Sequence, residues 1–119
     1  MLSQPEQLRD RTKKFALRVI RLYRSLPYRT DTQVLGKQLL RCGTSVAANY
    51  RAVCRSRSKA EFVARIGIVV EESDEAVLWL ELMTESGIVS EEKTKELLKE
   101  ANELTALFAA SQRTAKQVA

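Results

Sequence analysis

The stretch Ser58–Gly87, SKAEFVARIGIVVEESDEAVLWLELMTESG, decides the fold class. Ser58 and Glu61 have the Ser-x-x-Glu spacing of a capping box, in which the two residues satisfy each other's backbone N–H groups at a helix start. Gly87 is the residue type that most readily takes the left-handed conformation that closes a helix. Between them, buried-type residues alternate at spacings of four and three, as on one face of a helix: Phe62, Ile66, Val69, Ser73, Ala76, Leu80 and Met83. We therefore predict a long helix here.

The same spacing predicts three further helices. The first, about Glu6 to Leu26, has the seam Leu8, Thr12, Phe15, Val19, Leu22 and Leu26. The second, about Thr32 to Arg57, has the seam Leu35, Leu39, Cys42, Val46, Asn49 and Val53. The last begins after Ser90 and frays near Ser111, with the seam Leu97, Ala101, Leu104 and Phe108.

Short turns separate these segments. Leu26-Pro27 ends the first helix, because proline disfavours helical conformation in the residue before it. Thr30 or Asp31 offers a cap for the second helix, and Ser90 offers one for the fourth. Four seams of similar length joined by short turns favour an all-α fold, an antiparallel up-down four-helix bundle, formed by residues 1–119 as a single domain.

Composition excludes several function classes. No run approaches the ~20 apolar residues of a membrane span, and the first ten residues lack the apolar stretch of a signal peptide, so we expect a cytoplasmic protein. Cys42 and Cys54 are too far apart along one helix for a disulfide, and the chain has no histidine. A zinc site, a Cys-His nucleophile and a histidine-containing di-iron centre are therefore excluded. No phosphate-binding glycine loop or nucleophile motif is present, so we expect no cofactor, no metal and no enzymatic activity.

Charge is strongly segregated along the chain. The net charge is +5 overall, but residues 1–60 carry +11 and residues 61–87 carry −6. Cations at helical spacing form a ridge on each of the first two helices, and such ridges bind phosphates with strong salt dependence and little sequence preference. The predicted nucleic-acid-binding residues are Arg11, Lys14, Arg18, Arg21, Lys37, Arg41, Arg51 and Arg55. The alternative is ordinary surface charge that pairs with acidic residues of the third helix: Glu71, Glu72, Asp74 and Glu75.

Two surfaces predict self-association. The second helix carries a stripe of mostly small residues, whose glycines each cost about 1 kcal/mol in a helix unless another backbone passes close by. The third helix is apolar over a wider arc than one side of a small bundle covers. From these surfaces we predict the interface residues Gly43, Ala47, Tyr50, Ile68, Trp79 and Leu82. The alternatives are close packing within one bundle and a deeply buried third helix.

Polar residues near the seams have structural interpretations. Glu72 and Glu75 share a face and could act as paired carboxylates, but salt bridging is the favoured role. Asn49 lies at a seam position, where an amide must find hydrogen bonds, and we predict that it fixes the packing register.

The sequence also resembles a known family. The residues that carry the likeness are Gln38–Asn49 (QLLRCGTSVAAN), Arg57–Phe62 (RSKAEF) and Glu75–Leu82 (EAVLWLEL). They resemble the four-helix-bundle proteins of the 23S rRNA intervening-sequence family. The Thr-Ser-Val-x-x-Asn and Ser-Lys-x-Glu-Phe elements are the most specific. Where many members continue with Ile-Ala-Glu-Gly, this chain has Tyr50–Val53 (YRAV), so no role of that family glutamate transfers here.

This resemblance implies a bundle that commonly assembles as a homopentamer. It also implies a relationship to the accessory variability protein of diversity-generating retroelements. That protein associates with a reverse transcriptase and nucleic acid. The leading hypothesis is thus a non-enzymatic homo-oligomer that binds RNA or DNA, with RNA as the leading candidate, through its basic ridges. The alternative is a protein-binding scaffold or accessory subunit for a nucleic-acid enzyme.

Overall fold

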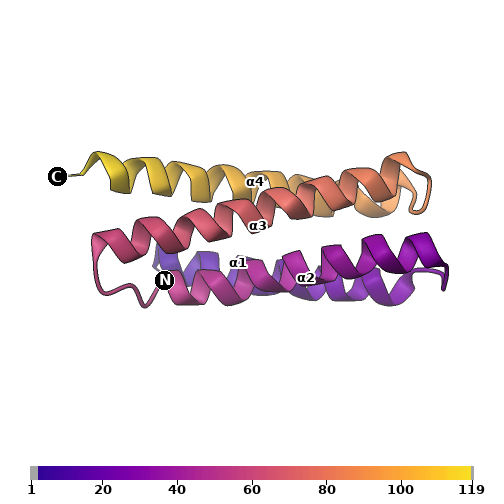
Figure 1. Cartoon of the computed structure of the whole chain (residues 1–119), viewed down its shortest axis with the longest axis horizontal. Helices are drawn as coiled ribbons and strands as arrows, with labels where there is room; N and C mark the ends of the chain where they lie inside the picture. Colours follow the sequence, from indigo (N-terminus) through magenta and orange to yellow (C-terminus); the bar gives the residue numbers. More distant parts are fainter. Residues whose placement is uncertain (1–2, 119) are drawn as a thin grey trace.

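Four antiparallel helices form the whole of the described structure, as Figure 1 shows. The computed structural model describes residues 3–118 of the 119-residue chain. Its helices are α1 (Gln4–Ser25), α2 (Thr30–Val53), α3 (Lys59–Glu85) and α4 (Glu91–Gln117). Short turns join consecutive helices at alternating ends of the bundle. The predicted all-α, up-down four-helix bundle is confirmed.

The bundle is elongated and has two layers. Its principal extents are 49 × 27 × 19 Å. In Figure 1, α1 and α2 form the lower layer and α3 and α4 the upper one. The strongly basic part of the sequence therefore occupies one layer. Within residues 3–118, no helix is both long enough and apolar enough to cross a bilayer.

The predicted seams form the core. Val19 and Phe15 of α1, Leu39 of α2, Leu80 of α3 and Phe108 of α4 all have no exposed side-chain surface. Burial of such side chains is the main driving force for folding, at roughly 25 cal/mol per Å² of apolar surface. The period of four and three residues thus predicted correctly which face of each helix is buried.

Helix starts differ from the predictions in three places. α1 begins at Gln4 because Ser3 and Glu6 form a complete capping box, which the sequence analysis missed. α2 begins at Thr30 without a side-chain cap, and the one backbone N–H that Asp31 accepts is that of the adjacent Thr32, at 2.8 Å.

The third of these differences is at the start of α3, where half of the predicted capping box is present. Ser58 Oγ accepts from the N–H of Glu61 at 3.1 Å, but the Glu61 carboxylate accepts from the N–H of Arg57 at 3.2 Å. The backbone hydrogen bond from Arg57 is the main reason that the pKa of Glu61 is lowered. Glu61 therefore secures the turn before α3 rather than the cap itself.

Helix ends also differ from two expectations. α2 stops at Val53 instead of Arg57, because the N–H groups of Arg55 and Ser56 bond to carbonyls only three residues back and tighten the last turn. α4 continues to Gln117 instead of fraying near Ser111. Gln112 Nε2 donates to the backbone oxygen of Val63 at 3.3 Å, which ties this last part of α4 to α3. The predicted closure at Gly87 is confirmed by its φ of 82°.

Candidate nucleic-acid interface and the outer face of α3

The predicted cations fall into two groups. Arg18, Arg21, Lys37, Arg51 and Arg55 form no ion pair with any residue from 3 to 118. The other three, Arg11, Lys14 and Arg41, are paired with carboxylates. Of these three, Arg41 alone pairs with acidic residues of the third helix, as the surface-charge alternative predicts, whereas Arg11 pairs with α4 and Lys14 with α1.

Arg11 joins α1 to α4. Its Nε donates to Glu100 Oε2 at 3.1 Å, and its Nη2 donates to Glu103 Oε2 at 3.2 Å. The hydrogen bond that Arg11 donates to Glu100 is the main reason that the pKa of Arg11 is raised. Arg18 lies on the same side and borders a crevice of 180 Å³ with Glu100 and Glu103. These two cations of the α1 ridge therefore face the acidic side of α4.

Lys14 has a partner on its own helix. Its Nζ lies 2.9 Å from Asp10 Oδ2, one helical turn away, and both side chains are exposed. Such exposed pairs contribute little to stability, at most about 1 kcal/mol. Lys14 can therefore exchange Asp10 for a phosphate at small cost.

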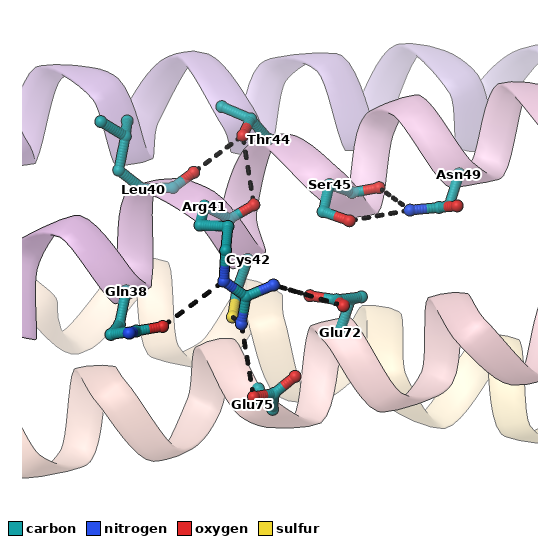
Figure 2. Close-up of polar contacts among 9 residues, drawn as sticks. All are labelled: Gln38, Leu40, Arg41, Cys42, Thr44, Ser45, Asn49, Glu72 and Glu75. Atoms are coloured by element: carbon teal, nitrogen blue, oxygen red, sulfur yellow. Dashed lines mark hydrogen bonds and ion pairs between the residues drawn. The ribbon is translucent and has the colours of Figure 1, made fainter.

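Arg41 joins α2 to α3 through a fork of contacts, shown in Figure 2. Its Nη1 lies 3.2 Å from Glu72 Oε2, and its Nη2 lies 3.4 Å from Glu75 Oε1. Nη2 also lies 3.2 Å from Cys42 Sγ, and Nε contacts Gln38 at 3.4 Å. Cys42 and then the carboxylates raise the pKa of Arg41. The predicted salt-bridging role of Glu72 and Glu75 is confirmed.

The same cluster is the place to test for a metal site. One ligand atom from each of Cys42, Glu72 and Glu75 lies within 4.8 Å of the others. Burial raises the pKa of the Cys42 thiol to about 11, whereas a metal ligand must be the thiolate. The Arg41 guanidinium already forms ion pairs with both carboxylates. A metal would have to displace this cation, so the arrangement fits an ion-pair network better than a metal centre.

A basic groove runs between α1 and α2. It has a volume of 530 Å³, and its charged residues are Arg9, Lys13 and Arg51, with Asp10 as the single acid. All four side chains are exposed. The antiparallel pairing of the helices brings the start of α1 beside the end of α2, so cations more than forty residues apart in sequence share one groove.

Of the eight predicted nucleic-acid-binding residues, only Arg51 lines this groove. The predicted set leaves out Arg9 and Lys13, because the ridges were drawn on each helix separately. The pairing of the start of α1 with the end of α2 in an up-down bundle could have identified both.

Small residues line the rest of this groove. They are Thr44, Ala47 and Ala48 of α2. The Thr44 hydroxyl donates to its own helix, at 2.8 Å from the backbone oxygen of Leu40, as Figure 2 shows. It therefore does not need a ligand to satisfy its hydrogen bonding, and the groove surface between the cations is largely methyl groups.

The stripe of small residues on α2, which includes Gly36 and Gly43, packs against α1. A Cβ on Gly36 would lie 2.9 Å from Leu26 Cδ1, and one on Gly43 would lie 2.8 Å from Val19 Cγ2. Tyr50 is 5% exposed, and its ring centroid lies 5.4 Å from that of Phe108. These contacts favour the alternative of close packing within one bundle for Gly43 and Tyr50. Ala47 is half-buried beside the basic groove.

The third helix, in contrast, is not enclosed by its own chain. Ile68 is 45% exposed and Leu82 is 41% exposed. Trp79, on the same helical face, is half-buried, and its Nε1 is the one buried side-chain nitrogen or oxygen without a hydrogen-bond partner in the described structure. We call Ile68, Glu72, Glu75, Trp79 and Leu82 the α3 stripe. It is an exposed apolar surface with the Arg41 ion pairs at its centre.

Comparison with known proteins identifies the family. The model of the family described as 23S rRNA-intervening sequence protein matches residues 7–110. The chain belongs to this family. It is also similar to the crystal structure of a protein of unknown function from the S23 ribosomal protein family of Bacteroides thetaiotaomicron, with 28% sequence identity and a TM-score of 0.85. That match covers 93% of this chain and 99% of the other. No curated protein matches the chain.

The motif residues of this 23S rRNA-intervening sequence protein have local structural roles. Asn49 Nδ2 donates to the backbone oxygen of Ser45 at 2.9 Å and to its hydroxyl at 2.7 Å, as Figure 2 shows. Asn49 is therefore satisfied within α2, and no hydrogen bond to a neighbouring helix supports the predicted role in register. In the second motif, Glu61 also pairs with Arg65 at 3.1 Å. The first motif therefore forms hydrogen bonds within α2, and the second lies at the start of α3.

Proposed function

We propose that this protein is a non-enzymatic homo-oligomer that binds nucleic acid, with RNA as the preferred class, without sequence specificity. The supporting observation is the group of exposed cations that line the α1–α2 groove without a carboxylate partner among the described residues: Arg9, Lys13 and Arg51. Phosphate neutralisation by such cations releases counterions and gives affinity that falls steeply with salt.

Self-association is the second part of the proposal, and the α3 stripe supports it. Apolar side chains exposed at this level are typical of a surface that another protein covers. The basic groove lies between α1 and α2, so assembly through α3 leaves the groove open to a nucleic acid.

Fluorescence anisotropy with a labelled RNA, titrated at a series of salt concentrations, tests the nucleic-acid part. The groove variant Arg9→Ala/Lys13→Ala/Arg51→Ala should weaken binding and make the slope of log K against log salt shallower by about one unit per lost phosphate contact. The control Lys93→Ala/Lys95→Ala/Lys116→Ala removes the same charge from α4, so it should have a smaller effect. Equal effects of the two triple variants would show that only net charge matters and would contradict the groove assignment.

The sequence-predicted ridge gives a third comparison. Arg11→Ala, Lys14→Ala, Arg18→Ala and Arg21→Ala together remove four cations, but Arg11 and Lys14 are already paired with carboxylates. We expect this variant to change the salt slope less per cation than the groove variant does. A larger change per cation would place the binding surface on the outer side of α1 instead.

An accessory subunit of a nucleic-acid enzyme, such as a reverse transcriptase, is the second candidate function. The α3 stripe favours it, because an accessory protein needs an apolar contact surface in addition to a basic one. Co-purification with a candidate enzyme that survives nuclease treatment, and that Ile68→Lys/Leu82→Lys abolishes, would support this function. Loss of co-purification on nuclease treatment would show that nucleic acid alone connects the two proteins.

A further inference from the structure

The α1–α2 groove combines several cations with an absence of exposed aromatic rings. Single-stranded nucleic acids bind mainly by stacking their bases on aromatic side chains, in addition to phosphate contacts. Within residues 3–118, the only aromatic side chain among the exposed large hydrophobic residues is Tyr28, which is 92% exposed. It lies in the turn between α1 and α2, at the end of the bundle opposite the groove.

Tyr28 is too far away to serve the groove. Arg9 and Ser25 are separated by sixteen residues of α1, which corresponds to about 24 Å at 1.5 Å per residue. A base stacked on Tyr28 would therefore lie about seven nucleotide spacings from Arg9, if nucleotides are roughly 3.4 Å apart along a stacked strand. The groove itself offers a ligand only charge, methyl groups and backbone.

The neutral side chains of the groove offer no free donor for reading base edges. The Thr44 hydroxyl donates within α2, and Ala47 and Ala48 present only methyl groups. Arg9, Lys13 and Arg51 are donors without fixed acceptors in the chain, and their positions on both sides of the groove suit two rows of phosphates. Phosphate contacts position a protein on nucleic acid but carry no sequence information.

Without stacking, charge density decides which nucleic acid binds more tightly. The salt slope is about −0.9 per neutralised phosphate for a B-form duplex and about −0.7 for a single strand. If the two complexes are equally tight at 1 M salt, this difference in slope makes the duplex complex about fourfold tighter at 0.1 M salt for three contacts and about tenfold tighter for five. Lys37 is exposed near the start of α2, and Arg55 is exposed just after its last residue, Val53. Neither forms an ion pair within residues 3–118 and neither lines the groove, so only a ligand long enough to reach them would make these further contacts.

We infer that the α1–α2 groove binds the phosphodiester backbone of a duplex in preference to a single strand, without reading its sequence. This inference rests on the proposed nucleic-acid-binding function. It names the class of ligand, a double helix, from the chemistry of the groove.

Competition between matched probes tests the inference. The probes are a 20-base-pair RNA duplex, a DNA duplex of the same sequence, and an unstructured 20-nucleotide oligouridine, each measured by anisotropy between about 50 and 200 mM salt. We expect both duplexes to bind at least fourfold more tightly than oligouridine at 0.1 M salt and to show the steeper slope. RNA and DNA duplexes that bind within about twofold of each other would indicate backbone recognition, whereas a large difference would indicate that helix geometry is also read.

Failure of the inference can be separated from failure of the proposed function. If oligouridine binds as tightly as the duplexes while the triple groove variant weakens both, the duplex preference is wrong but the groove binds nucleic acid. If the groove variant binds every probe as the wild type does, the proposed function is wrong for this surface.

An added aromatic side chain provides an independent check. Ala48 is exposed at the groove, so Ala48→Tyr supplies the missing stacking surface without removing a cation. We expect oligouridine to bind about fivefold more tightly and the duplexes to gain nothing. The control Ala106→Tyr, at an exposed position of α4, should leave all three affinities unchanged. An equal gain for duplex and single strand with Ala48→Tyr would overturn the inference.

Discussion

Val19 of α1 lies directly against Gly43 of α2. A Cβ on Gly43 would be 2.8 Å from Val19 Cγ2, 2.9 Å from Cγ1 and 3.0 Å from Cβ. Val19 is fully buried, and its branched side chain has one strongly preferred rotamer in a helix. The two helices therefore approach as closely as they do only because residue 43 has no side chain.

Gly43→Ala should destabilise the bundle. The added methyl group would force α1 and α2 apart, and such overpacking costs about 1–3 kcal/mol, more than the ~1 kcal/mol that alanine gains in helix propensity. Urea unfolding followed by circular dichroism measures the difference. The control is Gly67→Ala on α3, where the nearest atom is the end of the Gln112 side chain, which can move away. We expect that variant to lose less stability than Gly43→Ala, because only the 3.3 Å hydrogen bond from Gln112 to Val63 has to shift, and a more stable Gly43→Ala would contradict the close packing.

The paired and unpaired arginines of α2 should differ in binding. Arg41 contacts Glu72 and Glu75, whereas Arg51 borders the groove without an ion pair among the described residues. Arg41→Ala should therefore change RNA affinity less than Arg51→Ala does, but it should lower the free energy of unfolding more, because it leaves Glu72 without its partner. Anisotropy and urea unfolding on the same two variants measure both quantities. A larger affinity loss for Arg41→Ala would show that the fork opens to bind RNA.

The fold could be predicted from sequence because one pattern controls it. The spacing of four and three residues marks the buried face of every helix, as Phe15, Leu39, Leu80 and Phe108 illustrate. Helix limits were less predictable, since they depend on single hydrogen bonds. The end of α2 depends on three-residue backbone bonds near Ser56, and the length of α4 reflects its contact with α3 through Gln112.

The candidate site was less predictable than the fold, because it depends on which helices are neighbours. A ridge drawn on α1 alone includes Arg11, but the structure shows that Arg11 faces the carboxylates of α4. Arg9 and Arg51 are far apart in sequence and meet only through antiparallel packing. Similarly, the glycine at position 43 signalled a close approach correctly, but the sequence could not say whether the approaching helix belonged to the same chain.

The turn before α3 should weaken at acidic pH. The pKa of Glu61 is lowered below its usual 4.5, chiefly because its carboxylate accepts the N–H of Arg57. A carboxylate with a lowered pKa stabilises the fold above its unfolded pKa, and this stabilisation is lost as the pH falls through the folded pKa. Glu61→Gln should therefore reduce the free energy of unfolding at pH 7 and have a much smaller effect at pH 3.

Urea unfolding at the two pH values measures this dependence. Glu81→Gln is the matched control, because Glu81 is exposed and forms no ion pair with another residue in the range 3–118. Its effect should be small at both pH values. An effect of Glu61→Gln that is the same at pH 3 as at pH 7 would show that the carboxylate charge contributes nothing to the turn.

The α3 stripe should control self-association. Light scattering should give the wild type a mass that is a multiple of 13.5 kDa. Ile68→Lys/Leu82→Lys places two charges on the apolar part of the stripe, where desolvation in an interface would be costly, so we expect this variant to be a monomer. Both side chains are more than 40% exposed in the isolated bundle, so the variant should keep its helical content. Leu17→Lys is the matched control, because Leu17 is also 41% exposed but lies on α1. A wild-type monomer, or dissociation by Leu17→Lys alone, would move the interface away from α3 or remove it altogether.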